Sequence, residues 1–541
     1  MLETRNFNDV VIFRPSQEHE TKIYDRIKSA IFDRFTPGTY TCKPDIVEIV
    51  NFMYQEYYNI LEEYLPKPSP RDLVDFLVTE YERYGKVSDM HKRKELSLED
   101  DEFWAAYASY SRRGIKYLLE LLFRSELDET NVSLTREEQE EAISIAFLAT
   151  EELVSLYMRS EGYKSYMDSV TLTLDPSKHT YFHVTEDEHT RFDIRDIALD
   201  FYKYVPNPMF LDDFKAHGEI LDASFVSTLG VNYGDTIGTI SWLIEHYSTE
   251  RDEEETCYFI LREAIDSIAN AFGISKDQAS KIIEGFSLSH QTMEGRELHR
   301  PKQEYRAYKR AFFKHRLNGE DVAFFSLRMA RECLNKLVSD FPFRKVPQEW
   351  ESTSINSSLN KLSLRAGRWF EGVVVENLKT LGIIGSHSVK SLRKSPNERI
   401  LIPKDVGEID FLGFHKEQKL IVIIEVKQVG LATEPRLFLD DLSKFVYGAD
   451  NYSSKFIKKY NWIIQNSASV ENHFKQEFGL DTKLESAGYA MITLYPSVVT
   501  TKIHEFTCIS IAKFMNESKK AESWPFSKAP LQVLPLLEDQ M

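Results

Sequence analysis

The chain has 541 residues, which is too long for one hydrophobic core and suggests about three or four folding units. Its hydrophobic content of 42%, with 13% aromatic residues, excludes a disordered chain, and its four scattered cysteines lack the spacing of a zinc knuckle. The start of the chain has no signal-peptide pattern, and no run approaches the roughly 18 to 20 apolar residues that a membrane helix needs. We therefore expect a soluble, cytoplasmic protein with no membrane partner.

The charge is divided unevenly along the chain. Residues 1–350 hold 43 Lys and Arg against 63 Asp and Glu, whereas residues 351–541 hold 24 against 22. The distribution of charge therefore matters more than the net charge of -18, because the first part of the chain is strongly acidic and the second part is nearly neutral. The change coincides with residues 340–360, where two prolines and a cluster of Ser and Asn interrupt helical patterning. We expect the main domain boundary there.

Helical periodicity dominates the first part. Residues 71–85 carry apolar side chains at spacings of three and four, which is the stripe of a helix packed on one side. Residues 101–127 and 135–160 repeat the pattern with acidic first turns, which suit the positive end of a helix dipole. Alternating β-branched and aromatic residues at 170–184 predict a hairpin. The expected domains are a helical region at 1–165, a helical region with a β-hairpin at 166–345, which could regulate the protein or contact nucleic acid, and an α/β domain at 355–541.

After residue 360 the pattern changes to helix, strand, strand, helix, strand. The predicted helices are residues 364–382, ending at Gly382, and residues 439–460, broken near Gly448. The predicted strands are residues 407–414, 419–428, 461–465 and 489–496. The expected fold class is α+β overall, with a mostly α-helical N-terminal region followed by an α/β domain that has a central mixed sheet.

Residues 407–428, GEIDFLGFHKEQKLIVIIEVKQ, place charged side chains in two apolar strands. If the strands form an antiparallel hairpin closed by KEQK, Asp410 lies across from Glu425 and Glu408 lies across from Lys427. Since side chains alternate along a strand, all four then point to one face. A five-residue turn would shift the register by one and send Asp410 and Glu425 to opposite faces.

Two carboxylates opposed at about 4.5 to 5.5 Å between Cβ atoms repel each other unless a cation or a proton lies between them. The run at 421–424 is typical of a central strand covered on both faces, where carboxylates are costly to desolvate. Hard oxygen ligands favour Mg²⁺ or Mn²⁺ over zinc, since no Cys is near and His415 lies at the turn. The alternative is a surface pair of Glu408 with Lys427 beside two solvated acids on an edge strand, which the unbroken apolar run argues against.

GEID, followed after a short hairpin by IIEVKQ, resembles the PD-(D/E)xK nuclease superfamily, which has the restriction-endonuclease-like fold. The resemblance covers roughly residues 360–500 and says nothing about the first 350 residues. The dipeptide before the hairpin is Ile-Asp and not Pro-Asp, at a position that varies widely in the superfamily. A helix that often bears a glutamate begins the family core, which implies a role for Glu371, with Glu376 as the second choice.

The resemblance implies a role for each residue of the motif. Asp410 and Glu425 would be metal ligands, and the backbone carbonyl of Val426 could be another. Lys427 would orient the attacking water or stabilise charge that develops on the phosphate. Gln428 follows this lysine, as a polar residue often does in the family.

Residues 299–316, HRPKQEYRAYKRAFFKHR, combine basic and aromatic residues. On a helix, a basic stripe able to track a phosphate backbone would consist of Lys302, Arg306, Lys309, Arg310 and Lys314. The alternative is a solvated helix whose aromatic residues pack inward and whose cations pair with acidic neighbours, and both interpretations stay open. Residues 268–286 have the spacing of a helix-turn-helix, but we favour an ordinary helical corner.

Together these features predict a metal-dependent nuclease with Mg²⁺ or Mn²⁺ as its cofactor. DNA is the expected substrate by analogy with the family, and both phage defence and DNA repair fit. The acidic N-terminal region would recruit a protein partner or restrain the nuclease, and a homo-oligomer is possible. The rival hypothesis is a non-catalytic nucleic-acid-binding or scaffolding protein on the same fold.

Overall fold

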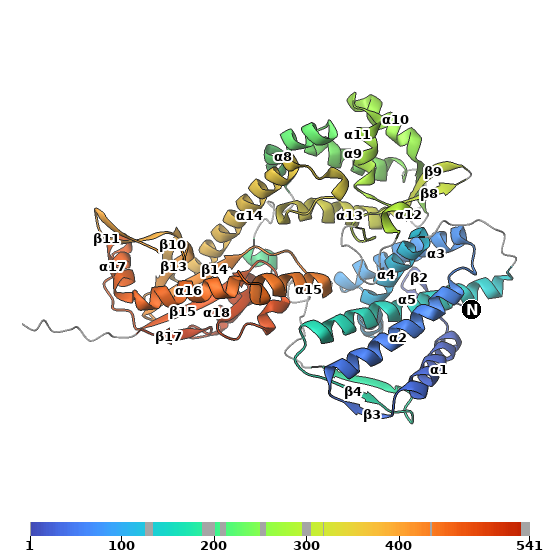
Figure 1. The fold of residues 1–541 in the computed structure, drawn as a ribbon, viewed down its shortest axis with the longest axis horizontal. Helices are drawn as coiled ribbons and strands as arrows, with labels where there is room; N and C mark the ends of the chain where they lie inside the picture. The colour runs from blue at the N-terminus through green and yellow to red at the C-terminus, as the bar shows by residue number, and fades with distance from the viewer. Residues whose placement is uncertain are drawn as a thin grey trace, which may run out of the picture. The chain divides into compact units, whose positions relative to one another are not determined.

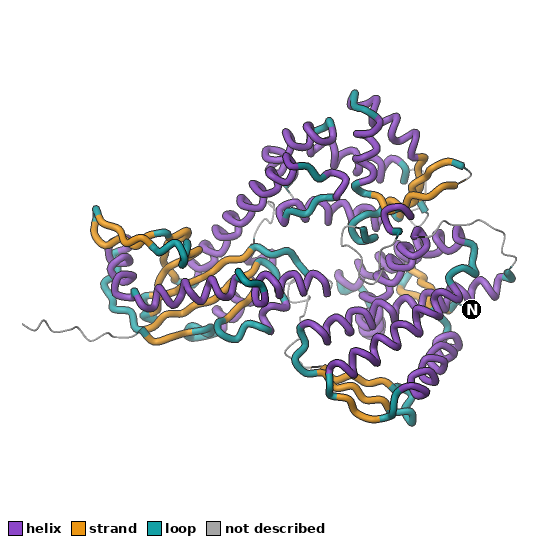
Figure 2. The backbone as a smooth tube through the Cα atoms, viewed as in Figure 1, coloured by secondary structure: helices purple, strands orange, loops and turns teal. Residues whose placement is uncertain are grey.

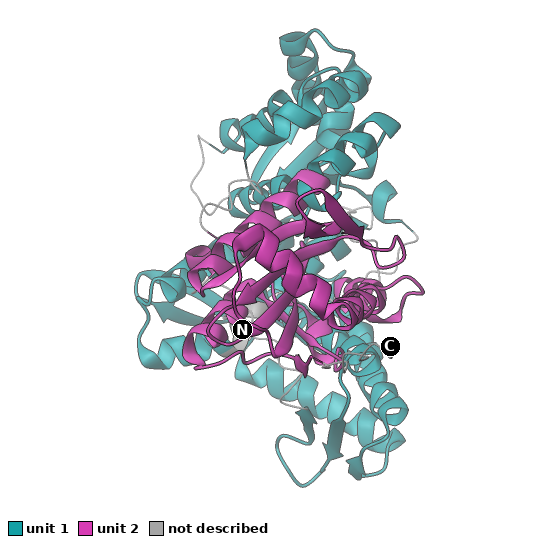
Figure 3. Cartoon of the chain, turned by 90° about the vertical axis from the view of Figure 1, so that its left-hand side faces the viewer, with its two compact units in different colours: residues 1–186, 211–362 teal, residues 187–210, 363–541 magenta. Residues whose placement is uncertain are grey.

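The structure is a computed structural model that describes residues 2–124, 134–186, 201–205, 213–248, 256–294, 305–317, 319–432 and 435–531 (Figure 1). The chain forms two compact units, coloured separately in Figure 3: unit 1 comprises residues 1–186 and 211–362, and unit 2 comprises residues 187–210 and 363–541. Helices prevail in unit 1, and unit 2 adds a larger mixed sheet, so the predicted α+β class is confirmed (Figure 2). The finer division into three domains stays a prediction. Among the helices of these described stretches, none has the length and apolar character needed to cross a bilayer.

Long amphipathic helices build the first part of unit 1, and the predicted helical segments are confirmed where they are described; residues 125–127 of the segment 101–127 lie outside the described residues. These helices are α1 (Gln17–Arg34), α2 (Lys43–Tyr64), α3 (Pro70–Lys92), α4 (Leu98–Arg124) and α5 (Arg136–Ser165). Helix α5 begins with a capping box, in which the side chains of Thr135 and Glu138 each accept the backbone N–H of the other residue. Two small sheets accompany the helices, one of β1 (Glu3–Phe7) and β2 (Val10–Arg14), the other of β3 (Gly38–Tyr40), β4 (Val170–Leu174) and β5 (Phe182–Glu186). Strands β4 and β5 form the predicted hairpin.

The second part of unit 1 packs further helices with a small sheet in the order β6-β9-β8-β7. The helices are α8 (Phe214–Leu229), α9 (Tyr233–His246), α10 (Leu261–Phe272), α11 (Lys276–Glu284), α12 (His290–Met293) and α13 (Leu327–Asp340). The strands are β6 (Cys257–Ile260), β7 (Ser287–Leu288), β8 (Phe312–Leu317) and β9 (Glu320–Phe325). Gly273, with φ 64°, ends α10 in the left-handed conformation and allows the turn into α11. Lys276 of α11 pairs with Asp266, and the Gln278 side chain caps its own helix, as in an ordinary helical corner.

The basic stretch 299–316 does not form the predicted helix where it is described. Residues 305–311 form turns and an extended segment, and residues 312–317 form β8, because pairing with β9 and β7 overrides any helical preference. Lys302 lies outside the described residues. The other four cations pair with acids of unit 1: Arg306 with Glu120, Lys309 with Asp340, Arg310 with Glu349 and Lys314 with Glu284. The helical stripe is therefore wrong, the ion pairing of the alternative is present, and nucleic-acid binding by these cations stays a prediction.

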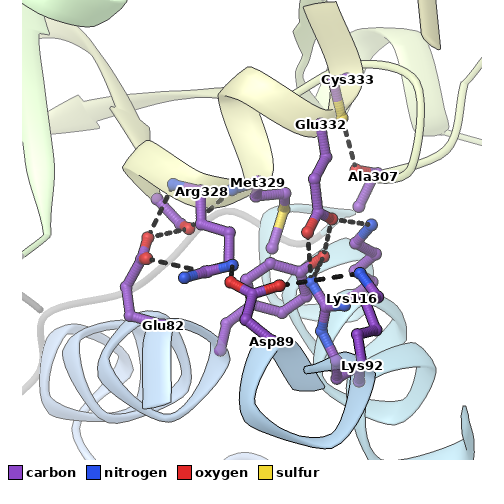
Figure 4. A network of polar contacts seen from close by, with 12 residues as sticks. Glu82, Asp89, Lys92, Lys116, Ala307, Arg328, Met329, Glu332 and Cys333 are labelled. Carbon is purple, nitrogen blue, oxygen red and sulfur yellow. Dashed lines mark hydrogen bonds and ion pairs between the residues drawn. The ribbon is translucent and has the colours of Figure 1, made fainter. Parts of the chain in front are cut away.

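A network of charged side chains joins α3 and α4 to α13 inside unit 1 (Figure 4). Arg328 lies between two acids of α3. Its backbone N–H donates to Glu82 at 2.9 Å, and a guanidinium N–H donates to Asp89 at 2.7 Å. Gly85 leaves room for this arginine, since a Cβ at that position would lie 2.1 Å from Arg328 Cδ. The missing side chain of Gly85 therefore allows the arginine to reach both acids.

Unit 2 is built on a six-stranded mixed sheet in the order β10-β13-β14-β15-β16, with β17 pairing with β15. The strands are β10 (Ile383–Val389), β13 (Ile409–His415), β14 (Leu420–Lys427), β15 (Ser486–Thr493), β16 (Thr507–Ser510) and β17 (Lys528–Pro530). Strand β14 is central, antiparallel to β13 and parallel to β15, and its residues 420–426 are all buried. Strands β11 (Ser391–Ser395) and β12 (Glu398–Leu401) form a separate hairpin.

The helices of unit 2 confirm two predictions and overturn a third. They are the part of α14 (Thr353–Thr380) that follows residue 362, α15 (Pro435–Leu442), α16 (Tyr452–Gln465), α17 (Ser467–Phe478) and α18 (Ile511–Lys520). The predicted helix at 364–382 is the second part of α14, and the break near Gly448 separates a π-helical turn from α16. The strand predicted at 461–465 is wrong, because these residues are the last turn and a half of α16, with Ile463 buried. The strand predicted at 489–496 corresponds to β15.

A short segment from earlier in the chain belongs to unit 2. Asn377 of α14 donates its side-chain amide to the Tyr204 carbonyl at 2.7 Å, and the Tyr204 hydroxyl donates to Asn516 at 2.7 Å. The ring of Phe201 stacks on Tyr495 with centroids 5.0 Å apart. Unit 2 therefore includes residues 201–205 in addition to the chain after residue 362.

Candidate active site

The hairpin of β13 and β14 has the predicted register. His415 pairs with Leu420, and the ladder continues to the pair of Phe411 with Ile424. The turn is KEQK, in which the backbone N–H of Lys419 donates to the Lys416 carbonyl at 3.1 Å. A four-residue turn fixes which side chains share a face, and this register puts Asp410 and Glu425 on the same face.

Asp410 and Glu425 lie together just beyond the last pair of the ladder. One oxygen of Asp410, Oδ2, accepts the backbone N–H of Val426 at 2.8 Å. Glu425 is 2% exposed and belongs to the central strand, where its parallel neighbour on β15 is Met491. The side chain of Asp410 thus replaces a strand hydrogen bond and ties the two carboxylates to one end of the hairpin.

Two lysines bridge these carboxylates. Lys427 Nζ lies 2.6 Å from Glu425 Oε1 and 3.4 Å from Asp410 Oδ2. Lys459 Nζ lies 2.6 Å from Glu425 Oε2 and 3.5 Å from Asp410 Oδ1. Both oxygens of Glu425 therefore have an ammonium partner, and the four formal charges sum to zero.

The predicted pairing of Glu408 with Lys427 is wrong. Glu408 pairs instead with Lys390 at 3.2 Å, and its side chain is well exposed. The ladder of β13 with β14 ends before this position, and Gly407 at φ 80° turns the chain there, so strict cross-strand opposition no longer applies. Lys427 is two residues from Glu425 on the same strand face and contacts that carboxylate instead.

Lys459 is the site residue that the sequence reasoning missed. It comes from α16, where the buried residues Ser453, Phe456, Tyr460 and Ile463 form a stripe at helical spacing. Lys459 lies on this buried stripe and is 8% exposed. A lysine at an apolar position of an amphipathic helix was the available signal, because a buried ammonium needs a carboxylate partner.

The carboxylates control the protonation of Lys427. Burial alone would lower the pKa of this lysine, but the charges of Glu425 and Asp410 outweigh burial and raise the pKa above its usual range. Lys427 therefore stays an ammonium at neutral pH. Its Nζ also lies 5.2 Å from the centre of the Tyr452 ring, a cation–π distance.

Glu371 supplies a third acid from α14. Burial raises the pKa of this carboxyl, and the negative charges of Asp410 and Glu408 raise it further, which marks an excess of negative charge on this side of the site. The hydroxyl of Ser388 donates to Glu371 Oε2 at 3.5 Å. Ser388 has φ 53°, a left-handed conformation rare for a residue other than glycine, and it lies between the ladder pairs His387 with Phe411 and Val389 with Ile409.

An open cavity of about 840 Å³ adjoins the acids. Its wall includes Arg368, Glu371, Ser388, Asp410, Lys455 and Lys459. The cavity therefore brings cations and carboxylates of unit 2 to one solvent-accessible place, where a polar ligand larger than a metal ion has room.

Two further predicted residues lie at the end of β14. Val426 is buried and donates its backbone N–H to Asp410. The side-chain nitrogen of Gln428 is buried and has no hydrogen-bond partner within the part of the chain that the structure describes. The predicted roles of the Val426 carbonyl and of Gln428 stay predictions.

The donor set suits a hard divalent ion. Within the described residues no group of three or more His, Cys, Asp or Glu side chains is close enough to hold a metal ion by itself. Mg²⁺ does not require such a cage, because one or two carboxylates with water and substrate phosphate are its usual ligands. Asp410 and Glu425 provide two carboxylates, and Glu371, whose pKa is raised first by burial and then by the charges of Asp410 and Glu408, lies at the wall of the same cavity as Asp410. The residues therefore fit Mg²⁺ or Mn²⁺.

Comparison with protein-family models, with curated proteins and with solved structures gives no match for this chain. The resemblance to the PD-(D/E)xK nucleases accordingly depends on the sequence of roughly residues 360–500 alone.

Proposed function

We propose that unit 2 is a Mg²⁺- or Mn²⁺-dependent nuclease of the restriction-endonuclease-like kind, which hydrolyses phosphodiester bonds of DNA in the cytoplasm. The observation that carries the proposal is the convergence of Asp410, Glu425 and Lys427 at the end of one buried hairpin. The resemblance of GEID and IIEVKQ to the motif of that superfamily supports it. Phage defence and DNA repair are both compatible contexts.

The buried cluster explains how the residues would act. A divalent ion held by Asp410 and Glu425 would supply positive charge to the scissile phosphate and favour deprotonation of the attacking water. Lys427 remains an ammonium, so it would orient that water or stabilise the developing phosphate charge as a hydrogen-bond donor. Glu371, whose pKa is raised by burial and by neighbouring acids, would face the same water or the leaving group across the cavity.

The test is cleavage of plasmid and of single-stranded and double-stranded oligonucleotides by the full chain with Mg²⁺, Mn²⁺ or EDTA. We expect cleavage only with a divalent ion, and a loss of at least about 100-fold in Asp410→Asn and Lys427→Met, which is the usual scale for removing a group that stabilises the transition state. Glu417→Gln is the matched control, because Glu417 is an exposed acid in the turn of the same hairpin. It should keep full activity.

A wild-type chain that cuts no DNA or RNA with any of these ions would contradict the nuclease. If that chain still bound nucleic acid, the non-catalytic binding or scaffolding protein would be the better interpretation. The acid excess of residues 1–350 would then favour a protein partner for unit 1, which is also its proposed role beside an active nuclease.

A further inference from the structure

The second lysine of the cluster has a position that the nuclease motif does not include. Lys459 comes from α16, 34 residues after Glu425, and its ammonium bridges Glu425 at 2.6 Å and Asp410 at 3.5 Å. The two carboxylates that would hold a divalent ion are thus already neutralised by two ammonium groups. Only Lys427 of these two belongs to the strand that carries the motif.

A divalent ion at these carboxylates would compete with an ammonium. Both oxygens of Glu425 are engaged at 2.6 Å, one by each lysine. An ion bound there would lie close to two positive charges in a buried place, where screening by water is weak and like charges repel strongly. One ammonium must therefore move when the ion binds.

Of the two lysines, Lys459 is the one whose side chain has space beside it into which it can rotate. Its side chain lines the open cavity of about 840 Å³ together with Asp410 and Lys455. Lys427 is held on the central strand only two residues from Glu425 and also faces the Tyr452 ring. Rotation of the flexible Lys459 side chain would carry its charge from the carboxylates into the cavity, whereas Lys427 would stay in contact with the acids.

We propose that Lys459 is a positioning residue that occupies the cation site when no metal is bound and moves to a phosphate group of the substrate when a divalent ion binds. The substrate part of this inference rests on the proposed nuclease function, whereas the competition with the ion does not. The exchange leaves a site with two carboxylates, a divalent ion and two ammonium groups. These five groups carry two net positive charges, which face the carboxyl group of Glu371 in the cavity wall and would attract the negative charge of a phosphodiester under attack.

Mn²⁺ binding to the full chain, measured by calorimetry without nucleic acid, tests the competition. Lys459→Met removes the charge and keeps the length of the side chain, so we expect it to bind Mn²⁺ at least about tenfold more tightly than the wild type. Lys459→Arg keeps the charge and should bind Mn²⁺ about as weakly as the wild type. Lys455→Met is the control, since Lys455 lies one turn earlier on α16, lines the same cavity and pairs with Asp450 at 2.7 Å. Equal Mn²⁺ affinity in Lys459→Met and the wild type would overturn the proposal.

Chemical labelling of lysines in the wild type gives a second measurement that needs no variant. We expect saturating Mn²⁺ to raise the acetylation rate of Lys459, read by mass spectrometry, and to leave that of Lys455 unchanged. A Lys459 that is equally protected with and without Mn²⁺ would contradict the movement. Neither measurement uses cleavage, so a failed nuclease assay and a failed competition would be told apart.

The substrate step has its own readout. If the wild type cleaves DNA, Lys459→Met should combine tighter Mn²⁺ binding with a kcat at least about tenfold lower, and Lys459→Arg should recover most of that loss. A variant that merely damaged the fold would lose Mn²⁺ affinity together with activity. Tighter ion binding with unchanged kcat would overturn the transfer to substrate phosphate.

Discussion

Removing Glu425 should expose the energetic cost of the buried cluster. The substitution Glu425→Ala takes away the 2.6 Å contact of both Lys427 and Lys459 and leaves them Asp410 at 3.4 and 3.5 Å. Two ammonium groups would then share one carboxylate inside the protein. Breaking a buried pair by removing one partner costs about 3 to 5 kcal/mol, because an uncompensated charge stays behind.

The structure places this variant toward the lower end of that range. The side chain of Lys427 is 20% exposed, so water would screen part of its excess charge. The side chain of Lys459 is 10% exposed, so water would screen its excess charge less. We therefore expect Glu425→Ala to lower the free energy of unfolding of unit 2 by about 3 kcal/mol.

The assay is hydrogen–deuterium exchange of the full chain, read on peptides of β13 and β14. Exchange resolves the stability of unit 2 by itself, which a single melting curve of a chain with two units would not do. The double variant Glu425→Ala with Lys459→Met removes one charge of each sign, so we expect it to recover at least about 1.5 kcal/mol of the cost of Glu425→Ala. A cost below about 1 kcal/mol, with additive effects in the double variant, would refute the description of the cluster as a buried, charge-compensated unit.

Three further predictions concern unit 1. In α3, Gly85→Ala should lower the free energy of unfolding by about 1 to 3 kcal/mol, because its Cβ would displace Arg328. In α9, Gly238→Ala should be neutral or stabilising by up to about 1 kcal/mol, because nothing lies within 4 Å of the added Cβ, and hydrogen–deuterium exchange on peptides of α3 and α9 compares the two variants. Burial raises the pKa of Glu152 to about 7, so the folded state should lose stability as the pH rises from about 5 to 8, by at most about 3 kcal/mol. Glu152→Gln should remove this pH dependence of the stability of α5, which hydrogen–deuterium exchange on peptides of α5 measures. Cys42 is exposed and the other three thiols are buried, so a thiol reagent should modify one cysteine per native chain, and more than one would contradict the burial.

The hairpin of unit 2 was predictable because its determinants are local. A four-residue turn between two apolar runs sets the register, and side-chain alternation then fixes which residues share a face. Asp410 and Glu425 therefore meet as the sequence indicated, with the added finding that Asp410 also accepts the Val426 N–H. The grouping of Glu408 with Lys427 failed because regular alternation ends where the ladder ends.

The remaining features depend on contacts between distant segments. Residues 461–465 have the β-branched and aromatic composition of a strand, yet they continue α16 because Ile463 extends its buried stripe. In the same way, β8 forms at 312–317 because β9 lies beside it, which no local pattern in the basic stretch indicates. Lys459 reaches Glu425 only after the sheet and α16 have packed together. Its burial could have been predicted from the stripe, but its partner could not.

Arginine and lysine serve differently in the buried ion pairs of this chain. Arg14 binds both oxygens of Glu151, at 2.6 and 2.9 Å, and Arg310 holds Glu349 in the same two-point manner. Arginine suits such fixed pairs, because its planar group matches a carboxylate and does not easily exchange partners. Lysines hold a buried carboxylate in unit 1, where Lys309, Lys336 and Lys345 pair with Asp340, and again in the candidate site. A lysine is a compact charge on a flexible stem that can rotate to a new partner. A buried ionic cluster is a poor way to gain stability compared with apolar packing. A cluster that contains the flexible Lys459, at the wall of an open cavity, suits the exchange with a divalent ion that we propose.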